Sequence, residues 1–194
     1  HPTSGTIRFD GQDITGFAAH QIRRLGVALV QQTPRAFPNM TVLENATLGA
    51  MFGAQGGPRR EGEAVRIGHE MLALVGLADR RYDHVNSLNL HEQRFLELAR
   101  ALSGYPKLLL LDEVMAGLND SELNASIAMV RSIREQLGVT MIWVEHVMPA
   151  VMQLAERVVV LNFGRVLAEG PAEVVMRDDS VIEAYLGSGA FGNA

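Results

Sequence analysis

The sequence predicts an α/β fold, in which a mainly parallel sheet is interrupted by an inserted block of helices. Leu108–Leu111 and Val139–Val144 are fully apolar runs with a helical pattern between them. Buried strands of parallel sheets have this composition, and a strand–helix–strand order produces parallel neighbours. Residues 38–103 contain only helical patterns. We therefore expect an α/β core of residues 1–37 and 104–194, with residues 38–103 as a helical subdomain.

Short elements are expected before the helical block. Residues 6–9 alternate in polarity and lead into Asp10-Gly11, which is typical of an edge strand followed by a tight turn. The apolar run Val27–Val30 predicts another strand, and the polar pair Gln31-Gln32 follows it. The chain therefore enters the block from a strand end.

Three helices are expected within the block. Residues 41–52 form the first, after the helix breakers Pro34 and Pro38. Each of the other two has apolar residues at helical spacing on one face. These residues are Ile67, Met71, Leu74 and Val75 in the second helix, and Phe95, Leu98, Ala99 and Leu102 in the third.

The elements after the block alternate between strand and helix. A helix is expected at residues 121–137, between the two apolar runs, and a short helix follows at residues 148–155. Residues 158–169 then predict a hairpin with its turn at residues 162–165. These elements complete the expected α/β core.

The composition narrows the class of protein. The 194 residues include no cysteine, and 17 Lys plus Arg against 22 Asp plus Glu give a net charge of −5. A disulfide framework and a thiolate zinc site are excluded, and the acidic balance argues against nucleic acid as a partner. No apolar run approaches the ~18 residues that a membrane-spanning helix needs.

Two acids, Asp112 and Glu113, directly follow the first apolar run. The carboxyl ends of parallel strands are where α/β folds bind ligands, so this pair is a candidate site. In nucleotide hydrolases such a pair holds Mg²⁺ through the metal's water shell and polarises the attacking water. A strand that simply ends in two solvated charges has the same sequence, so both interpretations stay open at this point.

Two further polar residues follow strands. His146 comes after the second apolar run, behind Glu145, and Gln32 comes after the strand Val27–Val30. At the same edge of the sheet, His146 would reach the γ-phosphate of a nucleotide and Gln32 would offer a ligand to a metal or water. A histidine at a strand end is more often structural, however, and a glutamine by itself is only a polar residue entering a loop.

Taken in order, these motifs resemble the ATP-binding subunit of an ABC transporter. Residues 32–45 resemble the Q-loop and its helix, Leu108–Glu113 resembles Walker B, and residues 116–119 resemble the D-loop. His146 resembles the switch histidine, and residues 157–170 resemble the terminal hairpin. The resemblance covers nearly the whole chain and implies a P-loop NTPase fold of the ABC type.

The resemblance implies an ATPase with ATP and Mg²⁺ as its cofactors. Gln32 would sense Mg²⁺ and the attacking water, Asp112 would hold the metal through water, and Glu113 would polarise the water. His146 would contact the γ-phosphate. Glu113 and His146 are therefore the implied catalytic residues.

The resemblance also implies partners. Two such subunits, identical or different, trap two ATP molecules head to tail, and Leu118 and Asn119 would communicate between them. Transmembrane permease subunits would dock on the surface formed by residues 35–51, at the cytoplasmic face of the cell membrane. A periplasmic or extracellular solute-binding protein would act indirectly. The motifs are most similar to those of importers of branched-chain amino acids and amides.

Four apolar residues on that surface have two interpretations. They would line the groove that receives the permease, or they would belong to the core of the helical subdomain. These residues are Phe37, Met40, Val42 and Leu43.

The signature segment departs from the family pattern. It runs Asn89-Leu90-His91-Glu92-Gln93, where a Ser-Gly-Gly-Gln-like turn is usual. Small residues there let backbone N–H groups approach a phosphate at a helix N-terminus. Asn89 can still cap the helix, whereas His91 fills space that glycine would leave. We expect these five residues to contact the nucleotide as a tolerated variant, with a dead site as the alternative.

The phosphate loop that the family needs is absent from the sequence, which contains no Gly-x-x-x-x-Gly-Lys-Ser/Thr motif. We expect the chain to be truncated at its N-terminus, lacking the Walker A strand, loop and helix. A non-hydrolysing interaction module or degenerate ABC domain is the alternative. A soluble ABC ATPase of DNA repair or translation is disfavoured, because the long coiled-coil or tandem insertions usual in those proteins are missing.

Overall fold

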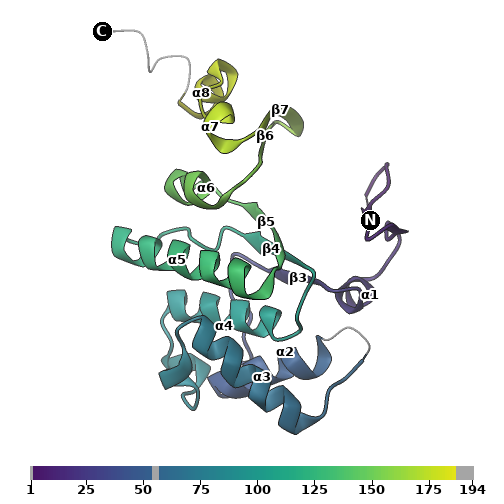
Figure 1. Cartoon of the computed structure of the whole chain (residues 1–194), viewed down its shortest axis with the longest axis vertical. Coiled ribbons are helices and arrows are strands. Elements are labelled where there is room, and N and C mark those ends of the chain that lie inside the picture. The colour runs from purple at the N-terminus through teal and green to yellow at the C-terminus, as the bar shows by residue number, and fades with distance from the viewer. Residues whose placement is uncertain (1, 54–56, 187–194) are drawn as a thin grey trace. The chain divides into compact units, whose positions relative to one another are not determined.

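The computed structural model describes residues 2–53 and 57–186, which divide into two compact units (Figure 1). The first unit holds the parallel sheet and the helical block, and the second holds the C-terminal hairpin. The first unit comprises His1–Val114 and Met129–Val144, and the second comprises Met115–Ala128 and Glu145–Ala194.

A small hairpin opens the first unit. Strands β1 (Arg8–Phe9) and β2 (Gln12–Asp13) pair antiparallel. Both turn residues, Asp10 and Gly11, have positive φ angles, of 52° and 81°, as a tight hairpin turn with right-handed strand twist requires. The predicted edge strand and turn are confirmed, although the strand is shorter than expected. Helix α1 (Ala19–Arg24) follows.

The first unit is built on a three-stranded parallel sheet. Its order is β3 (Val27–Val30), β4 (Leu108–Asp112) and β5 (Thr140–Val144). Helix α5 (Asp120–Leu137) connects β4 to β5. Both apolar runs therefore form the parallel strands that the sequence predicts.

One face of this sheet is covered more fully than the other. That face carries Val30, Leu109 and Leu111, which belong to the same core cluster as residues of α4 (Leu90–Leu102). The opposite face carries Leu29 and Ile142, whose side chains are 56% and 55% exposed. The expectation of strands buried on both faces is therefore right for one face only, because side chains of opposite parity point away from the core cluster.

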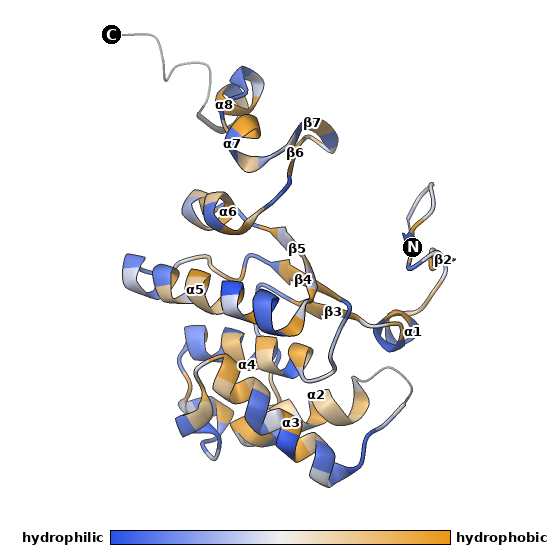
Figure 2. Ribbon diagram, in the orientation of Figure 1, coloured by the Kyte–Doolittle hydropathy of each residue, from blue (hydrophilic) through white to orange (hydrophobic). Residues whose placement is uncertain are grey.

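Helices α2 (Val42–Phe52), α3 (Glu61–Leu74) and α4 form the helical block, with 3₁₀ turns η1 (Ala78–Arg80) and η2 (Val85–Ser87) between α3 and α4. Their apolar faces turn toward one another in Figure 2. Of the residues expected on the two apolar faces, Phe95 and Leu74 are partly buried and the others are buried. The buried ones are Ile67, Met71, Val75, Leu98, Ala99 and Leu102.

A capping box fixes the start of α2. Thr41 Oγ1 accepts a hydrogen bond from the N–H of Glu44 at 3.2 Å, and the Glu44 carboxylate accepts one from the N–H of Thr41 at 2.7 Å. The hydrogen bonds that the Glu44 carboxylate accepts from the Thr41 N–H, and then from the Thr41 hydroxyl, lower the pKa of Glu44. The cap begins the helix at the end of the loop that follows β3.

The second unit contains the N-terminal part of α5, α6 (Met148–Leu154) and the hairpin of β6 (Val158–Asn162) and β7 (Arg165–Gly170). The hairpin turn has positive φ at Phe163 and Gly164, so the predicted turn is confirmed. Helices α7 (Ala172–Val175) and α8 (Asp179–Leu186) follow. A small core of Val160, Val175 and Val181 holds this unit together.

The division into an α/β core of residues 1–37 and 104–194 and a helical subdomain of residues 38–103 stays a prediction, since the two compact units have other boundaries. The elements described within the predicted subdomain are nevertheless helices and 3₁₀ turns, apart from one isolated bridge between Thr41 and His84. Among the described residues, none of the helices has the length and apolarity needed to cross a membrane.

Candidate functional site

The structure brings together two of the predicted site residues, Gln32 and Glu113. Strands β3 and β4 are parallel, with Val30 opposite Leu111, so continuing the register by two residues places Gln32 beside Glu113. Gln32 Nε2 donates a hydrogen bond to Glu113 Oε2 at 2.5 Å. The carboxamide therefore holds the carboxylate at the carboxyl edge of the sheet.

Glu113 is also fixed by its backbone. Its N–H donates to the carbonyl oxygen of Val144, at the end of β5, at 2.9 Å. Its φ angle is 48°, in the left-handed region that residues other than glycine rarely adopt. Strain of this kind clusters at functional sites, so the conformation agrees with a role for this carboxylate.

Asp112 is the last residue of β4 and is half-buried. Its carboxylate and the carboxamide oxygen of Gln32 are hard oxygen ligands of the kind that Mg²⁺ prefers. Gln32 uses its nitrogen, not its oxygen, on Glu113. The donor set at this edge therefore fits a magnesium ion that keeps part of its water shell.

His146, Leu118 and Asn119 lie in the second unit. Glu145, just before His146, accepts a hydrogen bond from the N–H of Met115 at 2.9 Å. Asn119 caps α5, because its Oδ1 accepts from the N–H of Glu122 at 3.0 Å. The expectation that His146 acts with Glu113 stays a prediction, and so does the role of Leu118 and Asn119 between subunits.

The start of α4 carries the five residues of the unusual signature. Asn89 Oδ1 accepts from the N–H of Glu92, and the Glu92 carboxylate accepts from the N–H of Asn89, both at 2.9 Å. The predicted cap by Asn89 is therefore confirmed, and Glu92 completes a capping box. Arg80 Nη1 donates to Glu92 at 2.6 Å, so a cation compensates this carboxylate. Hydrogen bonding to Asp83, above all, raises the pKa of Arg80.

The other signature side chains take separate positions. The His91 ring lies edge-on against Phe95, with 4.3 Å between centroids. Gln93 Nε2 donates to the carbonyl oxygen of Leu88 at 3.0 Å, and Leu90 is exposed. A side chain therefore stands where the family pattern has glycine at His91, while contact of these residues with a nucleotide stays a prediction.

A polar cluster that the sequence analysis missed holds the loop after Gln32. Glu97 Oε1 accepts hydrogen bonds from the N–H of Arg35 at 2.7 Å and from Arg100 Nη2 at 2.6 Å. Arg100 Nη1 donates to the carbonyl oxygen of Arg35 at 3.0 Å. Glu97 is only 6% exposed. The available signal was a glutamate between the apolar residues Leu96 and Leu98, where a solvated charge is not expected.

A second buried side chain holds the same loop. Asn45, in α2, is fully buried. Its Oδ1 accepts from the N–H of Phe37 at 2.8 Å, and its Nδ2 donates to the carbonyl oxygens of Phe37 at 3.2 Å and Thr41 at 3.0 Å. The loop backbone is thus satisfied by side chains of α2 and α4 in place of a strand ladder.

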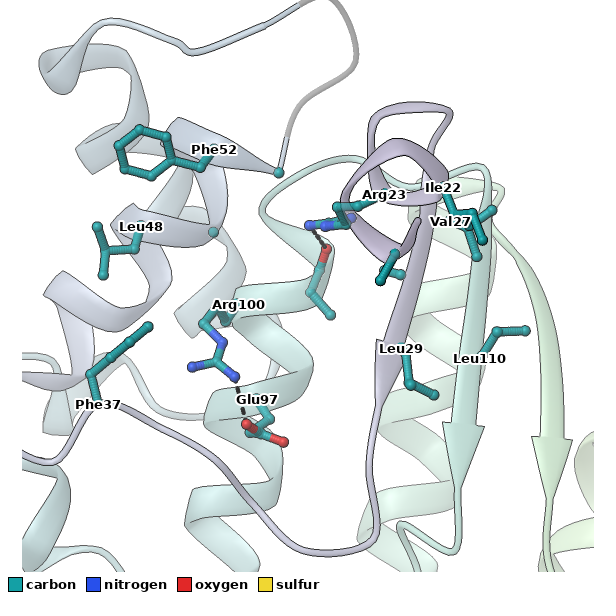
Figure 3. Close-up of a pocket in the computed structure, with 15 residues that line it drawn as sticks. Ile22, Arg23, Val27, Leu29, Phe37, Leu48, Phe52, Glu97, Arg100 and Leu110 are labelled. Atoms are coloured by element: carbon teal, nitrogen blue, oxygen red, sulfur yellow. Dashed lines mark hydrogen bonds and ion pairs between the residues drawn. The ribbon is translucent and has the colours of Figure 1, made fainter. Parts of the chain in front are cut away.

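A pocket of about 800 Å³ lies beside this loop, between α1, β3, α2 and α4 (Figure 3). Phe37, Leu48 and Phe52 stand on one side, and the Glu97–Arg100 pair lies within it. Its lining is otherwise mainly apolar, as is usual for ligand pockets. The remaining side-chain walls are formed by Ala19, Ile22, Arg23, Val27, Ala28, Leu29, Ala101 and Leu110.

Arg23 ties α1 to the end of α4 at the edge of the pocket. Its Nη2 donates to the carbonyl oxygen of Ala101 at 3.3 Å. Burial, and then the charge of Arg100, lower the pKa of Arg23. A cation at a helix C-terminus is stabilised by the helix dipole, so Arg23 caps α4 as well as lining the pocket.

The four apolar residues after Gln32 do not all lie in the same surroundings. Phe37 lines the pocket and is exposed. Val42 is fully buried, and Leu43 packs against the same core. Met40 is partly buried. The core interpretation is therefore right for Val42 and Leu43, whereas the permease-groove interpretation of Phe37 stays a prediction.

A parallel α/β sheet with acids and a carboxamide beyond adjacent strand ends has the arrangement of a ligand-binding α/β protein. The family described as ABC transporter matches residues 1–116. The family described as branched-chain amino acid ATP-binding cassette transporter matches residues 165–190. The chain belongs to the ABC transporter family, as one of its ATP-binding proteins.

Curated relatives and solved structures support membership of the same family. The chain is 36% identical to the high-affinity branched-chain amino acid transport ATP-binding protein BraF of Pseudomonas aeruginosa, over 96% of this chain and 77% of BraF. It is 34% identical to LivG of Escherichia coli K12 over the same shares. The crystal structure of the ADP conformation of MJ1267, an ATP-binding cassette of an ABC transporter, matches with a TM-score of 0.81. That match is 25% identical and covers 95% of this chain and 78% of MJ1267.

Proposed function

We propose that this chain is the ATP-hydrolysing motor subunit of an importer for branched-chain amino acids or related solutes. The names of BraF and LivG support the solute class. The observation that carries the proposal is the hydrogen bond from Gln32 to Glu113, next to Asp112. It supports the proposal because two carboxylates and an amide then lie at one edge of the sheet, where a base and a metal ligand would be needed.

Glu113 would act as the general base in this reaction. Its carboxylate would take a proton from water as the water oxygen attacks the γ-phosphorus, and the bond from that phosphorus to the ADP oxygen would break. The Gln32 carboxamide would orient the Glu113 carboxylate, since it donates to one of its oxygens. His146 would donate a hydrogen bond to the γ-phosphate as negative charge shifts toward the leaving oxygen.

Asp112, through water, and Gln32 would hold Mg²⁺. A bound Mg²⁺ would neutralise charge on the β- and γ-phosphate oxygens. Asp112 is the last residue of a strand that packs on the core through one face, so its carboxylate is held on a rigid element. Rigid placement of charge is what lets such a site stabilise a transition state without reorganising.

A second ATP-binding subunit, identical or different, would complete the site. In this arrangement Asn89, Leu90, His91, Glu92 and Gln93 would face a nucleotide held by that partner. The position of these residues at the N-terminus of α4 supports this, since a helix N-terminus attracts phosphate. Leu118 and Asn119 would lie at the contact between the subunits.

The pocket beside Phe37 would receive a short helix of a transmembrane permease. Its volume, its apolar walls and its position next to the loop after Gln32 support this. The subunit would then sit peripherally on the cytoplasmic face of the cell membrane, and a periplasmic or extracellular solute-binding protein would act through the permease. The proposal includes no nucleic-acid partner.

The test uses the full reading frame that encodes this chain, assembled with its permease in proteoliposomes. ATP turnover is expected, and Glu113→Gln is expected to reduce it by about a hundredfold or more, since general-base catalysis contributes about 10²–10⁴, while sparing ATP binding. Glu135→Gln makes the same change at an exposed residue of α5 and is expected to keep full turnover. Undiminished turnover in Glu113→Gln would refute the assignment.

A non-hydrolysing interaction module or degenerate ABC domain is the second candidate. One observation favours it, since side chains of Leu90 and His91 stand where small residues would admit a phosphate. Equilibrium binding of labelled ATP with Mg²⁺ separates the candidates. Binding without turnover in the assembled protein would favour this module over the motor.

A further inference from the structure

We propose that Glu97 and Arg100 of α4 are positioning residues that hold Gln32 on Glu113, acting through the backbone of Arg35. The kinetic part of this inference rests on the proposed ATP hydrolysis, whereas its structural part does not. The two side chains are named the α4 clasp below.

The α4 clasp takes both backbone polar groups of one loop residue. Glu97 accepts from the N–H of Arg35, and Arg100 donates to its carbonyl oxygen. The pair is also bonded to itself at 2.6 Å, in adjacent turns of α4. A carboxylate that is 6% exposed with two charge-assisted partners has a fixed rotamer. Both backbone polar groups of Arg35 are therefore bonded to side chains of α4.

The segment between the clasped Arg35 and the sheet edge that carries Glu113 is very short. Only Thr33 and Pro34 separate Arg35 from Gln32, and Pro34 has a fixed φ angle. On the other side, Gln32 is tied to β3, where Val30 is paired with Leu111. Fixed at both ends, this segment has little freedom, so the Gln32 carboxamide is presented to Glu113 in one place.

The clasp also borders the pocket. Glu97 and Arg100 are among the residues that line it, and the Arg100 guanidinium lies over the Phe37 ring, 5.4 Å from the ring centre (Figure 3). A segment that enters the pocket would touch the same side chains that fix Arg35. The clasp therefore gives a contiguous physical connection from the pocket to Glu113, through Arg35 and Gln32.

The structural test measures the NMR signal of the Gln32 carboxamide in the full chain. This signal is assigned as the one that disappears in Gln32→Ala. In the unaltered chain the signal is expected away from that of the exposed neighbour Gln31. Glu113→Gln and Glu97→Ala are both expected to move it, whereas Glu135→Gln is not. A Glu97→Ala chain that is folded and leaves the Gln32 signal unmoved overturns the proposal.

Arg100→Met is a second variant that tests the same prediction if Glu97→Ala does not fold. Arg100 is 24% exposed, so its loss leaves the Arg35 carbonyl close to solvent. The same movement of the Gln32 signal is expected in this variant. Glu97→Gln is the conservative variant, because its side-chain oxygen can still accept from the N–H of Arg35, and it is expected to keep the signal in place. Movement in Glu97→Gln equal to that in Glu97→Ala overturns the proposal.

The kinetic test is a double-mutant cycle in the assembled ATPase. Gln32→Ala and Glu97→Ala are each expected to lower kcat by about tenfold. If the clasp acts through Gln32, the double variant is no slower than Gln32→Ala alone, within about twofold. Multiplied losses would show that Glu97 acts independently of Gln32, against the proposal. An unaltered assembly that hydrolyses no ATP refutes the proposed function, and the NMR result then decides this inference.

Discussion

Gln32 Nε2 lies 2.5 Å from Glu113 Oε2, although the two residues follow different strands and lie far apart in the sequence. This contact depends on the parallel register of β3 and β4. It also depends on the left-handed conformation of Glu113, with its φ of 48°. A left-handed residue other than glycine costs about 1–2 kcal/mol, so the rest of the sheet edge must hold this carboxylate in place.

A negative charge at Gln32 is expected to shift the pH dependence of ATP turnover. Gln32→Glu would place a second carboxylate beside Glu113, and the repulsion favours keeping a proton on the pair. The pKa of the pair rises, so the acid limb of the pH–rate profile should move up by about one unit or more, and kcat at neutral pH should fall.

Gln31→Glu is the matched control for this charge. It makes the same change at the preceding residue, whose side chain is also exposed, and we expect its profile to match the unaltered protein. An acid limb that stays in place in Gln32→Glu would mean that the two residues are not paired in solution.

The main elements of the fold were predictable because their signals are local. Leu108–Leu111 is apolar throughout, and the segment that joins it to Val139–Val144 has helical periodicity, so parallel strands β4 and β5 follow directly. The partial exposure of Leu29 and Ile142 was not predictable from the same runs. An apolar side chain indicates that its burial is favourable, but it does not indicate which helix packs against it.

The candidate site was predictable residue by residue but not as an arrangement. Gln32 and Glu113 each follow a strand, which is visible in the sequence, whereas their contact depends on which strands are neighbours and in what register. The α4 clasp was missed for a related reason. Glu97 bonds the backbone of Arg35, and backbone groups have no residue-type signal in a sequence.

The two faces of the parallel sheet should differ in their tolerance of truncation. Leu109 is fully buried, so Leu109→Ala in the 194-residue chain should lower the free energy of unfolding by about 2–5 kcal/mol. Ile142 is 55% exposed, so Ile142→Ala should cost clearly less, about 1 kcal/mol. Chemical denaturation measures both, and equal losses would show that the face carrying Ile142 is covered in solution.

The Glu44 carboxylate of the α2 capping box should contribute to stability only above acid pH. Hydrogen bonds from Thr41 lower the pKa of Glu44 in the folded chain. The folded state therefore binds this proton less readily than the unfolded state does. The contribution is fully present above the unfolded pKa of about 4.3 and is lost as the pH falls through the lower folded value.

Glu44→Gln isolates this contribution. The unaltered chain should be more stable than Glu44→Gln at neutral pH, and the difference should shrink below about pH 4. Glu61→Gln, an exposed residue in the first turn of α3, serves as a comparison for the effect of charge at a helix start. A stability difference that does not change between pH 7 and pH 3 would contradict the lowered pKa.

Two helical glycines should respond in opposite ways to alanine. Gly49 is buried in α2, and a Cβ there would lie 2.1 Å from the backbone carbonyl oxygen of Arg100. A backbone group cannot rotate aside as a side chain can, so α2 and α4 would have to separate. We expect Gly49→Ala to lower the free energy of unfolding by about 3 kcal/mol.

Gly62 in α3 is the control, because a Cβ there meets nothing within 4 Å. Gly62→Ala should stabilise the chain by up to about 1 kcal/mol, since alanine loses less conformational entropy than glycine on entering a helix.

The separation of α2 from α4 in Gly49→Ala would also disturb the neighbouring α4 clasp. In that variant the Gln32 carboxamide signal should therefore move as it does in Glu97→Ala, whereas in Gly62→Ala it should stay. A Gly49→Ala chain as stable as Gly62→Ala would show that α2 and α4 are not in close contact at this position.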